Sequence, residues 1–316
     1  MPGDTSLKGA AEAWIASGSE GASTWSNATI RGRQGVLNLL LADYGSRSVS
    51  QVAPADIQRF LSRPGLKPAS RESYYRVLNT FFRWCVQQRY AEETPTQSVA
   101  KPAGGRKEVT YFTRAELKRF SQAALDYYRT HQKRIDSVGR GNFIWIEPLV
   151  RFAASTGLRK GELRHLRWCD VDTQEEKLFV RSYEGVWKGT SVTFRTKCSS
   201  DRVVPLYPMA LAVLDERAAH HVSENPEEPV FLGPTGRHLG DSQINRAFRQ
   251  VRRAASLPEQ LDVHALRHTF ATWLLSEGET LYRVSRWMGH KSVSVTADLY
   301  GHVVEGSSQV GVRVFG

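Results

Sequence analysis

The sequence predicts a mainly helical protein of two domains, with one small antiparallel β-sheet in the second domain. Apolar residues recur at helical spacing through most of the 316-residue chain, whereas residues 177–206 break into short β-branched runs that turn residues separate. The stretch "TPTQSVAKPAGGRKEV", residues 94–109, is rich in proline, glycine and basic residues and has no periodicity, most clearly over residues 99–109. We therefore interpret residues 99–109 as a linker between a helical domain, residues 1–98, and a mixed α/β domain, residues 110–316.

The first domain is predicted to consist of helices. Residues 29–45 form a helical segment that ends at Gly45, and residues 53–62 form another before Pro64 and Gly65. The strongest signal is an apolar stripe at helical spacing within residues 70–90, made by Tyr74, Leu78, Phe81, Phe82 and Cys85. Such a stripe is typical of a helix that buries one face.

The second domain is predicted to begin with a helix over residues 112–125, because Thr113 and Glu116 have the spacing of a capping box. The other predicted helices cover residues 143–156, 159–168 and 209–221 and continue to the end of the chain. The predicted strands cover residues 177–182, 191–197 and 202–206.

The charge balance favours an anionic partner. The net charge is +11 and the isoelectric point is near 9.7, so nucleic acid is the first candidate. The first residues lack the pattern of a signal peptide and no apolar stretch is long enough to span a bilayer, so we expect a cytoplasmic protein without a membrane partner. Three widely spaced cysteines argue against a disulfide framework and a cysteine zinc site.

The segment "HALRHTFATWLL", residues 264–275, combines a basic cluster with an apolar helix. Asp262 is a predicted N-cap, and at about 100° per residue His264, Arg267 and His268 share one face. The opposite face, predicted to lie in the core, consists of Leu266, Phe270, Trp273 and Leu274. The basic face is predicted to be exposed near the positive end of the helix dipole, which is suited to an anion.

A zinc site is the alternative for this helix. His264 and His268 have the i, i+4 spacing of zinc ligands. However, the cationic Arg267 lies between them, and the glutamate of the zinc hydrolase motif is missing. We therefore expect no metal and no other cofactor.

Four segments occur in a fixed order along the second domain: "TGLRKGEL", "TKCSSDRVVPL", "HALRHTFAT" and "MGHKSVSVTADLY". Together they resemble the active-site segments of the tyrosine recombinases, the phage integrase family. The resemblance extends from about residue 110 to the C-terminus. It is looser before that point, where "YYRVLNTFFRWCVQQ" and "TPTQSVAKP" resemble the family's helical core-binding domain and its exit.

The resemblance implies the fold given above and a set of catalytic residues, Arg159, Lys197, His264, Arg267, His290 and the nucleophile Tyr300, with Glu162 in support. Two arginines can clamp the oxygens of a phosphodiester without a metal. His264 would accept the Tyr300 proton or bond the phosphate, and Lys197 would protonate the departing 5′ oxygen. His290 would bond a phosphate oxygen. A 3′-phosphotyrosine conserves the ester bond, so that rejoining needs no ATP.

The implied partner is double-stranded DNA, bound by a homotetramer on two DNA sites, with an accessory DNA-bending protein as a further candidate. The candidate DNA-binding residues are Arg246, Arg249, Arg252 and Arg253 along one side of a helix, and Arg71 and Arg76 in the first domain. The tail, residues 307–316, alternates valines and is predicted to add a strand to a neighbouring subunit.

Several alternatives stay open. A type IB topoisomerase or a telomere resolvase would use the same chemistry, but the two-domain layout favours a recombinase. A DNA-binding regulator could keep the fold without catalysis, although every catalytic position is filled. A zinc hydrolase is the most distant alternative.

Overall fold

Helices form along most of the chain and the strands pair antiparallel. The predicted fold class, mainly helical with a small amount of antiparallel β-structure, is therefore confirmed. The computed structural model describes residues 5–20, 25–103, 109–136, 145–187, 189–196, 201–219, 225–233 and 236–306. Two of the predicted features, Lys197 and the tail 307–316, lie outside the described residues. The chain divides into two units, Met1–Lys107 and Glu108–Gly316, and this division falls inside the predicted linker.

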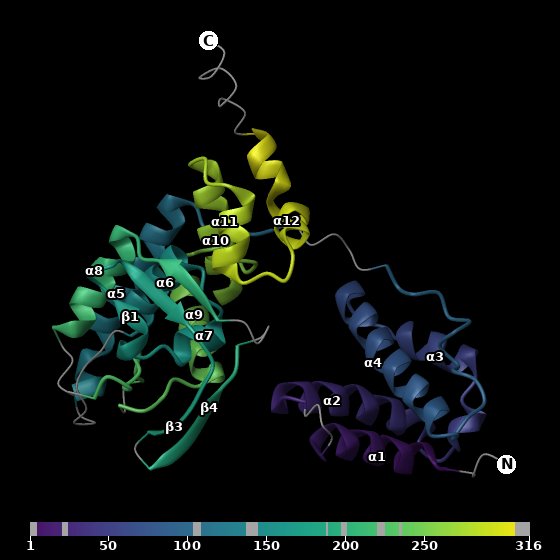
Figure 1. The fold of residues 1–316 in the computed structure, drawn as a ribbon. Coiled ribbons are helices and arrows are strands. Elements are labelled where there is room, and N and C mark those ends of the chain that lie inside the picture. The colour runs from purple at the N-terminus through teal and green to yellow at the C-terminus, as the bar shows by residue number, and fades with distance from the viewer. Residues whose placement is uncertain are drawn as a thin grey trace. The chain divides into compact units, whose positions relative to one another are not determined.

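The first unit is a group of helices around an apolar core (Figure 1). Its elements are α1 (Leu7–Glu20), α2 (Asn27–Tyr44), the 3₁₀ turn η1 (Val49–Gln51), α3 (Pro54–Leu61) and α4 (Pro68–Gln87). The predicted stripe on α4 buries Leu78, Phe81, Phe82 and Cys85, while Tyr74 is half-buried. Helix α2 ends at Gly45, as predicted.

The second unit combines helices with two small antiparallel sheets (Figure 1). Its helical elements are α5 (Arg114–Asp136), α6 (Ile146–Thr156), α7 (Lys160–Arg164), the 3₁₀ turn η2 (Trp168–Asp170), α8 (Pro208–Ala218), α9 (Asp241–Ala254), α10 (Val263–Ser276), α11 (Leu281–Met288) and α12 (Val293–Gly306). Its strands are β1 (Val171–Asp172), β2 (Lys177–Val180), β3 (Tyr183–Trp187), β4 (Thr190–Phe194) and β5 (Arg202–Pro205).

The predicted single sheet is split in two. Strands β1, β2 and β5 form one sheet, in which Leu178 pairs with Val204, and both residues are buried. Strands β3 and β4 form a separate hairpin, in which Tyr183 pairs with Phe194. The sequence did not indicate β3, because this strand has no buried face that would produce an apolar alternation.

Helix α6 lies at the centre of the second unit and packs against α5, α8 and α10. Burial of its apolar residues on most sides explains its strongly apolar sequence. Its C-terminus determines where the next segment starts, because Gly157 ends the helix with a left-handed φ of 63°. Beyond α10, helices α11 and α12 pack against each other and against α10 (Figure 1).

The predicted helix ends are present. Thr113 and Glu116 bond to each other's backbone N–H before α5, at 2.9 and 3.2 Å. Asp262 Oδ1 accepts from the backbone N–H groups of His264 and Ala265 at the start of α10. Within the described residues, no helix is long and apolar enough to cross a membrane.

We predict that Gly157→Ala lowers the stability of the second unit. An added Cβ would overlap the Phe270 ring, and an L-residue at a φ of 63° is strained by roughly 1–2 kcal/mol. The midpoint of urea unfolding should fall. Gly185→Ala is the matched control, because a Cβ at Gly185 would meet no atom within 4 Å. Equal midpoints for the two variants would contradict the prediction.

Candidate active site

Arg159 and Glu162 form the first part of the site, at the start of α7. The Glu162 carboxylate accepts from the Arg159 backbone N–H at 2.7 Å and from Arg159 Nη1 at 3.0 Å. The three-residue spacing therefore lets the carboxylate orient the guanidinium. Arg159 Nη2 also donates to the Gly289 carbonyl at 3.0 Å, which ties α7 to the end of α11.

Arg202 is a site residue that the sequence analysis missed. From β5 it donates to both Glu162 carboxylate oxygens, at 2.9 and 2.6 Å, and to the Trp287 carbonyl at 2.6 Å. Only 7% of its side chain is exposed. Strand alternation could have indicated this position, because Arg202 lies two residues before the buried Val204 and so shares its face.

The buried Glu162 carboxylate is held ionised by its partners. Burial alone would raise the pKa of this group, but the Arg202 hydrogen bonds and charge, together with Arg159, lower it overall. One carboxylate thus compensates two guanidinium groups. The arrangement around it keeps a net positive charge.

Arg267 corrects the prediction of an exposed basic face on α10. The residue is 2% exposed, and its guanidinium donates to the Gly157 and Met288 carbonyls. Helix α10 packs against α6, α11 and α12, which cover the middle of the helix around Arg267, whereas His264 in its first turn is exposed. On the predicted core face, Leu266 and Phe270 are buried but Trp273 and Leu274 are only half-buried.

Three consecutive carbonyls at the C-terminus of α11 bind the three arginines. The Trp287 carbonyl accepts from Arg202, that of Met288 from Arg267, and that of Gly289 from Arg159. The last carbonyls of a helix have no partner within the helix and lie at its negative end, so cations are stabilised there. Gly289, with a φ of 64°, ends α11.

His290 follows directly and faces the same charges. Its Nδ1 atom lies 2.8 Å from Thr296 Oγ1. Burial first, and then the charges of Arg267 and Arg159, lower the pKa of His290 to about 4. The ring is therefore neutral at pH 7 and can donate one N–H.

Tyr300 lies on α12 and exposes none of its surface. Its hydroxyl lies 2.5 Å from His268 Nδ1, whereas the sequence led us to expect His264 as the acceptor of its proton or as a ligand of the phosphate. Burial raises the pKa of the Tyr300 phenol, and the nearby charge of Arg267 opposes this shift. The phenol is therefore protonated at neutral pH.

The candidate DNA-binding arginines differ in exposure. Arg246, Arg249 and Arg253 are exposed on α9. Arg252 is 5% exposed, because its guanidinium points inward and donates to the Glu259 carbonyl at 2.6 Å, which corrects the prediction that all four share one open side.

In the first unit, the two candidates on α4 also differ. Arg76 is exposed and lies 3.6 Å from Glu72, whereas Arg71 is half-buried. Arg76 is therefore the more accessible of the two to a phosphate, and both stay candidates.

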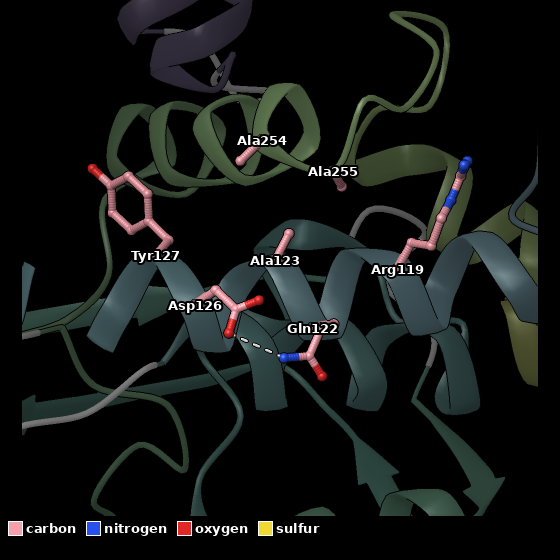
Figure 2. Close-up of a pocket in the computed structure, with 7 residues that line it drawn as sticks. All are labelled: Arg119, Gln122, Ala123, Asp126, Tyr127, Ala254 and Ala255. Atoms are coloured by element: carbon pink, nitrogen blue, oxygen red, sulfur yellow. Dashed lines mark hydrogen bonds between the residues drawn. The ribbon is translucent and has the colours of Figure 1, made fainter. Parts of the chain in front are cut away.

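Other features of the described residues are separate from this cluster. No group of three or more His, Cys, Asp or Glu side chains in the described part of the chain could hold a metal ion. A shallow groove between α5 and α9 is lined by Arg119, Gln122, Ala123, Asp126, Tyr127, Ala254 and Ala255 (Figure 2). None of the predicted site residues lines this groove. Within it, Gln122 Nε2 donates a hydrogen bond to Asp126 Oδ1 at 3.1 Å, drawn as the dashed line in Figure 2.

Comparison with known proteins identifies the family. The model of the phage integrase family matches residues 114–306. This match covers more than half of the chain, and the chain therefore belongs to the phage integrase family. The tyrosine recombinase family predicted from the four sequence segments is thus confirmed.

Relatives and solved structures agree with this assignment. A XerC-like tyrosine recombinase of Caldanaerobacter subterraneus is 27% identical over 286 residues, covering 83% of this chain and 70% of the relative. The tyrosine recombinase XerC of Oceanobacillus iheyensis is 26% identical over 280 residues, covering 84% and 81%.

Two solved structures share the fold. The integrase of transposon Tn1549 in complex with a circular intermediate DNA has a TM-score of 0.76 at 18% identity, covering 99% of this chain and 100% of that one. A lambda integrase dimer bound to a COC′ core site has a TM-score of 0.70 at 17% identity, covering 92% and 97%.

We predict that Glu162→Gln destabilises the second unit at pH 7 by roughly 3 kcal/mol, since it leaves the largely buried Arg202 and the half-buried Arg159 without their anionic partner. Because the folded pKa of Glu162 is lowered, its contribution is present above the ordinary glutamate pKa and is lost as the pH falls through the folded value. The difference in urea midpoint between wild type and variant should therefore shrink on acidification.

The control for this prediction is Glu184→Gln. Glu184 pairs with Arg195 on the β3–β4 hairpin, and both side chains are well exposed, so at most about 1 kcal/mol should be lost. A difference between wild type and Glu162→Gln that stays constant down to strongly acidic pH would contradict the assignment.

Proposed function

We propose that this protein is a site-specific DNA recombinase that cleaves and rejoins strands through a 3′-phosphotyrosyl intermediate, without metal or ATP. One observation carries the proposal: Arg159 and Arg267 bind neighbouring carbonyls at the end of α11, directly before His290, and Arg267 also acts electrostatically on Tyr300. Membership of the phage integrase family supports the same reaction.

Charge stabilisation is the task of the arginines. Attack on a phosphodiester places negative charge on the non-bridging oxygens, and fixed guanidinium groups stabilise this charge without reorganisation. Arg267 is held by two carbonyls and Arg159 by Glu162 and Gly289 before any substrate arrives. Such prior positioning stabilises the transition state more than the phosphodiester before attack.

The remaining predicted residues complete the site. The neutral His290 ring can donate to a phosphate oxygen. His264 is exposed in the first turn of α10, where it can bond the same phosphate. Lys197 is proposed to protonate the departing 5′ oxygen, because an alkoxide is a poor leaving group.

Double-stranded DNA is the proposed substrate and partner. The net charge of +11 and the exposed arginines of α9 favour backbone phosphate contacts. The two solved structures compared above are of integrases bound to DNA. A homotetramer on two DNA sites, with an accessory DNA-bending protein, is the assembly that we propose by analogy with the family.

The sharpest alternative is a DNA-binding regulator of the same fold without catalysis. A duplex that the protein binds can be enriched from a random-sequence pool by binding alone, without selection for cleavage. A nick is then introduced into this duplex, so that a cleaved strand cannot be rejoined and the intermediate accumulates. We expect wild-type protein to form a detergent-stable adduct with the 3′ end of this duplex in EDTA. Tyr300→Phe, which keeps the buried ring but lacks the nucleophile, should form none.

Tyr282→Phe is the matched control, since Tyr282 is 62% exposed on α11, and it should form the adduct as wild type does. Binding without an adduct would establish the regulator, and an adduct in Tyr300→Phe would remove Tyr300 from its role. Relaxation of supercoiled DNA without a paired site would indicate a type IB topoisomerase.

Arg249→Ala and Arg253→Ala should weaken binding to duplex DNA. Each lost phosphate contact should make the slope of log affinity against log salt less steep by about 0.9. Fluorescence anisotropy over a salt range of roughly 50 to 200 mM measures this slope. Arg129→Ala on α5, whose side chain pairs with Asp126, is the control and should keep the wild-type slope.

A further inference from the structure

His268, which is not among the predicted catalytic residues, contacts the oxygen that we propose as the nucleophile. His268 Nδ1 lies 2.5 Å from Tyr300 Oη, and the ring centroids are 5.8 Å apart. The sequence analysis noted His268 only as a neighbour on the helix face and gave it no role. The contact joins α10, which carries Arg267, to α12, which carries Tyr300.

The buried phenol needs a base in direct contact. Its pKa is raised by burial, so phenolate is scarce at neutral pH and the proton must leave as the oxygen attacks. His290 is a weak acceptor, because its own pKa is lowered to about 4 and its Nδ1 atom contacts Thr296. His268 Nδ1 already lies at hydrogen-bond distance from the proton in question.

The position of His268 on α10 keeps it near the reaction even if α12 moves. Tyr300 exposes no surface, so a phosphate can reach its oxygen only after a local opening. His268 follows Arg267 directly and lies one helical turn after His264, with the two imidazole centroids 4.8 Å apart. An oxygen that attacks a phosphate held by Arg267 and His264 therefore approaches His268 again.

We propose that His268 is a further catalytic residue, which accepts the proton of Tyr300 during strand cleavage. This inference rests on the function proposed above. For Nδ1 to accept, the ring proton of the resting imidazole must lie on Nε2.

The step balances as follows in atoms and charge. The bond between Tyr300 Oη and phosphorus forms while the bond between phosphorus and the 5′ oxygen breaks. The phenolic proton passes to His268 Nδ1, which becomes an imidazolium, and the departing 5′ oxygen takes a proton from a separate acid, for which Lys197 is the candidate. Rejoining returns both protons along the same routes.

The test measures single-turnover adduct formation on the nicked duplex described above, with His268→Asn and His268→Leu. The asparagine amide can occupy the place of Nδ1 and keep a hydrogen bond, but it cannot accept a proton at neutral pH. We expect both variants to be slower by about 10²-fold, within the range of a lost general base. His302→Asn, at an exposed position on α12, is the control and should react at the wild-type rate.

A duplex with sulfur in place of the departing 5′ oxygen identifies which proton is affected, because a thiolate leaves without protonation. The defect of both variants should persist on this duplex. A defect that disappears with sulfur would place His268 at the leaving group and overturn the proposal. A wild-type rate for His268→Asn would also overturn it, by reducing the contact to a hydrogen bond.

Stability is controlled separately. The DNA affinity and the thermal midpoint of each variant show whether it folds. If His268→Leu does not fold, the test is made with His268→Asn alone. Failure of wild-type protein to form any adduct on a duplex that it binds would refute the proposed function itself. That result differs from a wild-type adduct that forms equally fast in the His268 variants, which would refute only the role of His268.

Discussion

The end of helix α11 is the feature on which the rest of the site depends. Its last turn presents the carbonyls of three consecutive residues, Trp287 to Gly289, and each binds a different arginine. These arginines come from β5, α10 and the segment before α7, so a single helix terminus gathers three distant parts of the chain. The left-handed conformation of Gly289 turns the backbone away and leaves these carbonyls accessible.

The carbonyl dipoles and one carboxylate make a dense positive cluster tolerable inside a protein. Glu162 compensates part of the charge of Arg159 and Arg202. The hydrogen bonds of the Arg267 guanidinium in the described part of the chain go to backbone carbonyls. The excess positive charge then acts on the neighbouring groups. Burial and then this charge lower the pKa of His290, so that its ring is neutral at pH 7, and the charge of Arg267 partly opposes the effect of burial on the pKa of Tyr300. Fold stability and site electrostatics thus depend on the same contacts.

Features set by neighbouring residues could be predicted from the sequence. The apolar stripe of α4, the caps at Thr113 and Asp262 and the end of α2 at Gly45 each depend on residues close together in the sequence, and the structure contains them all. The four recognised segments also identified the family.

Features that depend on tertiary packing could not be predicted in this way. Helical periodicity defines a face but does not tell whether another element covers it, and this is why Arg267 and Arg252 were expected at the surface and are buried. The same limit applies to His264 and His268, which share a face one turn apart, so that only packing of α12 decides which of them meets Tyr300. Strand alternation could have placed Arg202 on the buried face of β5, but it does not indicate that its partner is Glu162, 40 positions away.

The placement of Tyr300 on α12 has a mechanical consequence for a severed strand. In the proposed reaction the broken DNA end would be tethered to the body of the protein through this 14-residue helix, which packs by Leu299, Tyr300 and Val303. The Tyr300 ring is itself part of that anchorage, so withdrawing it toward the phosphate would loosen the same helix that must retain the end. Retention of the DNA end and movement of the Tyr300 side chain therefore place opposing requirements on α12.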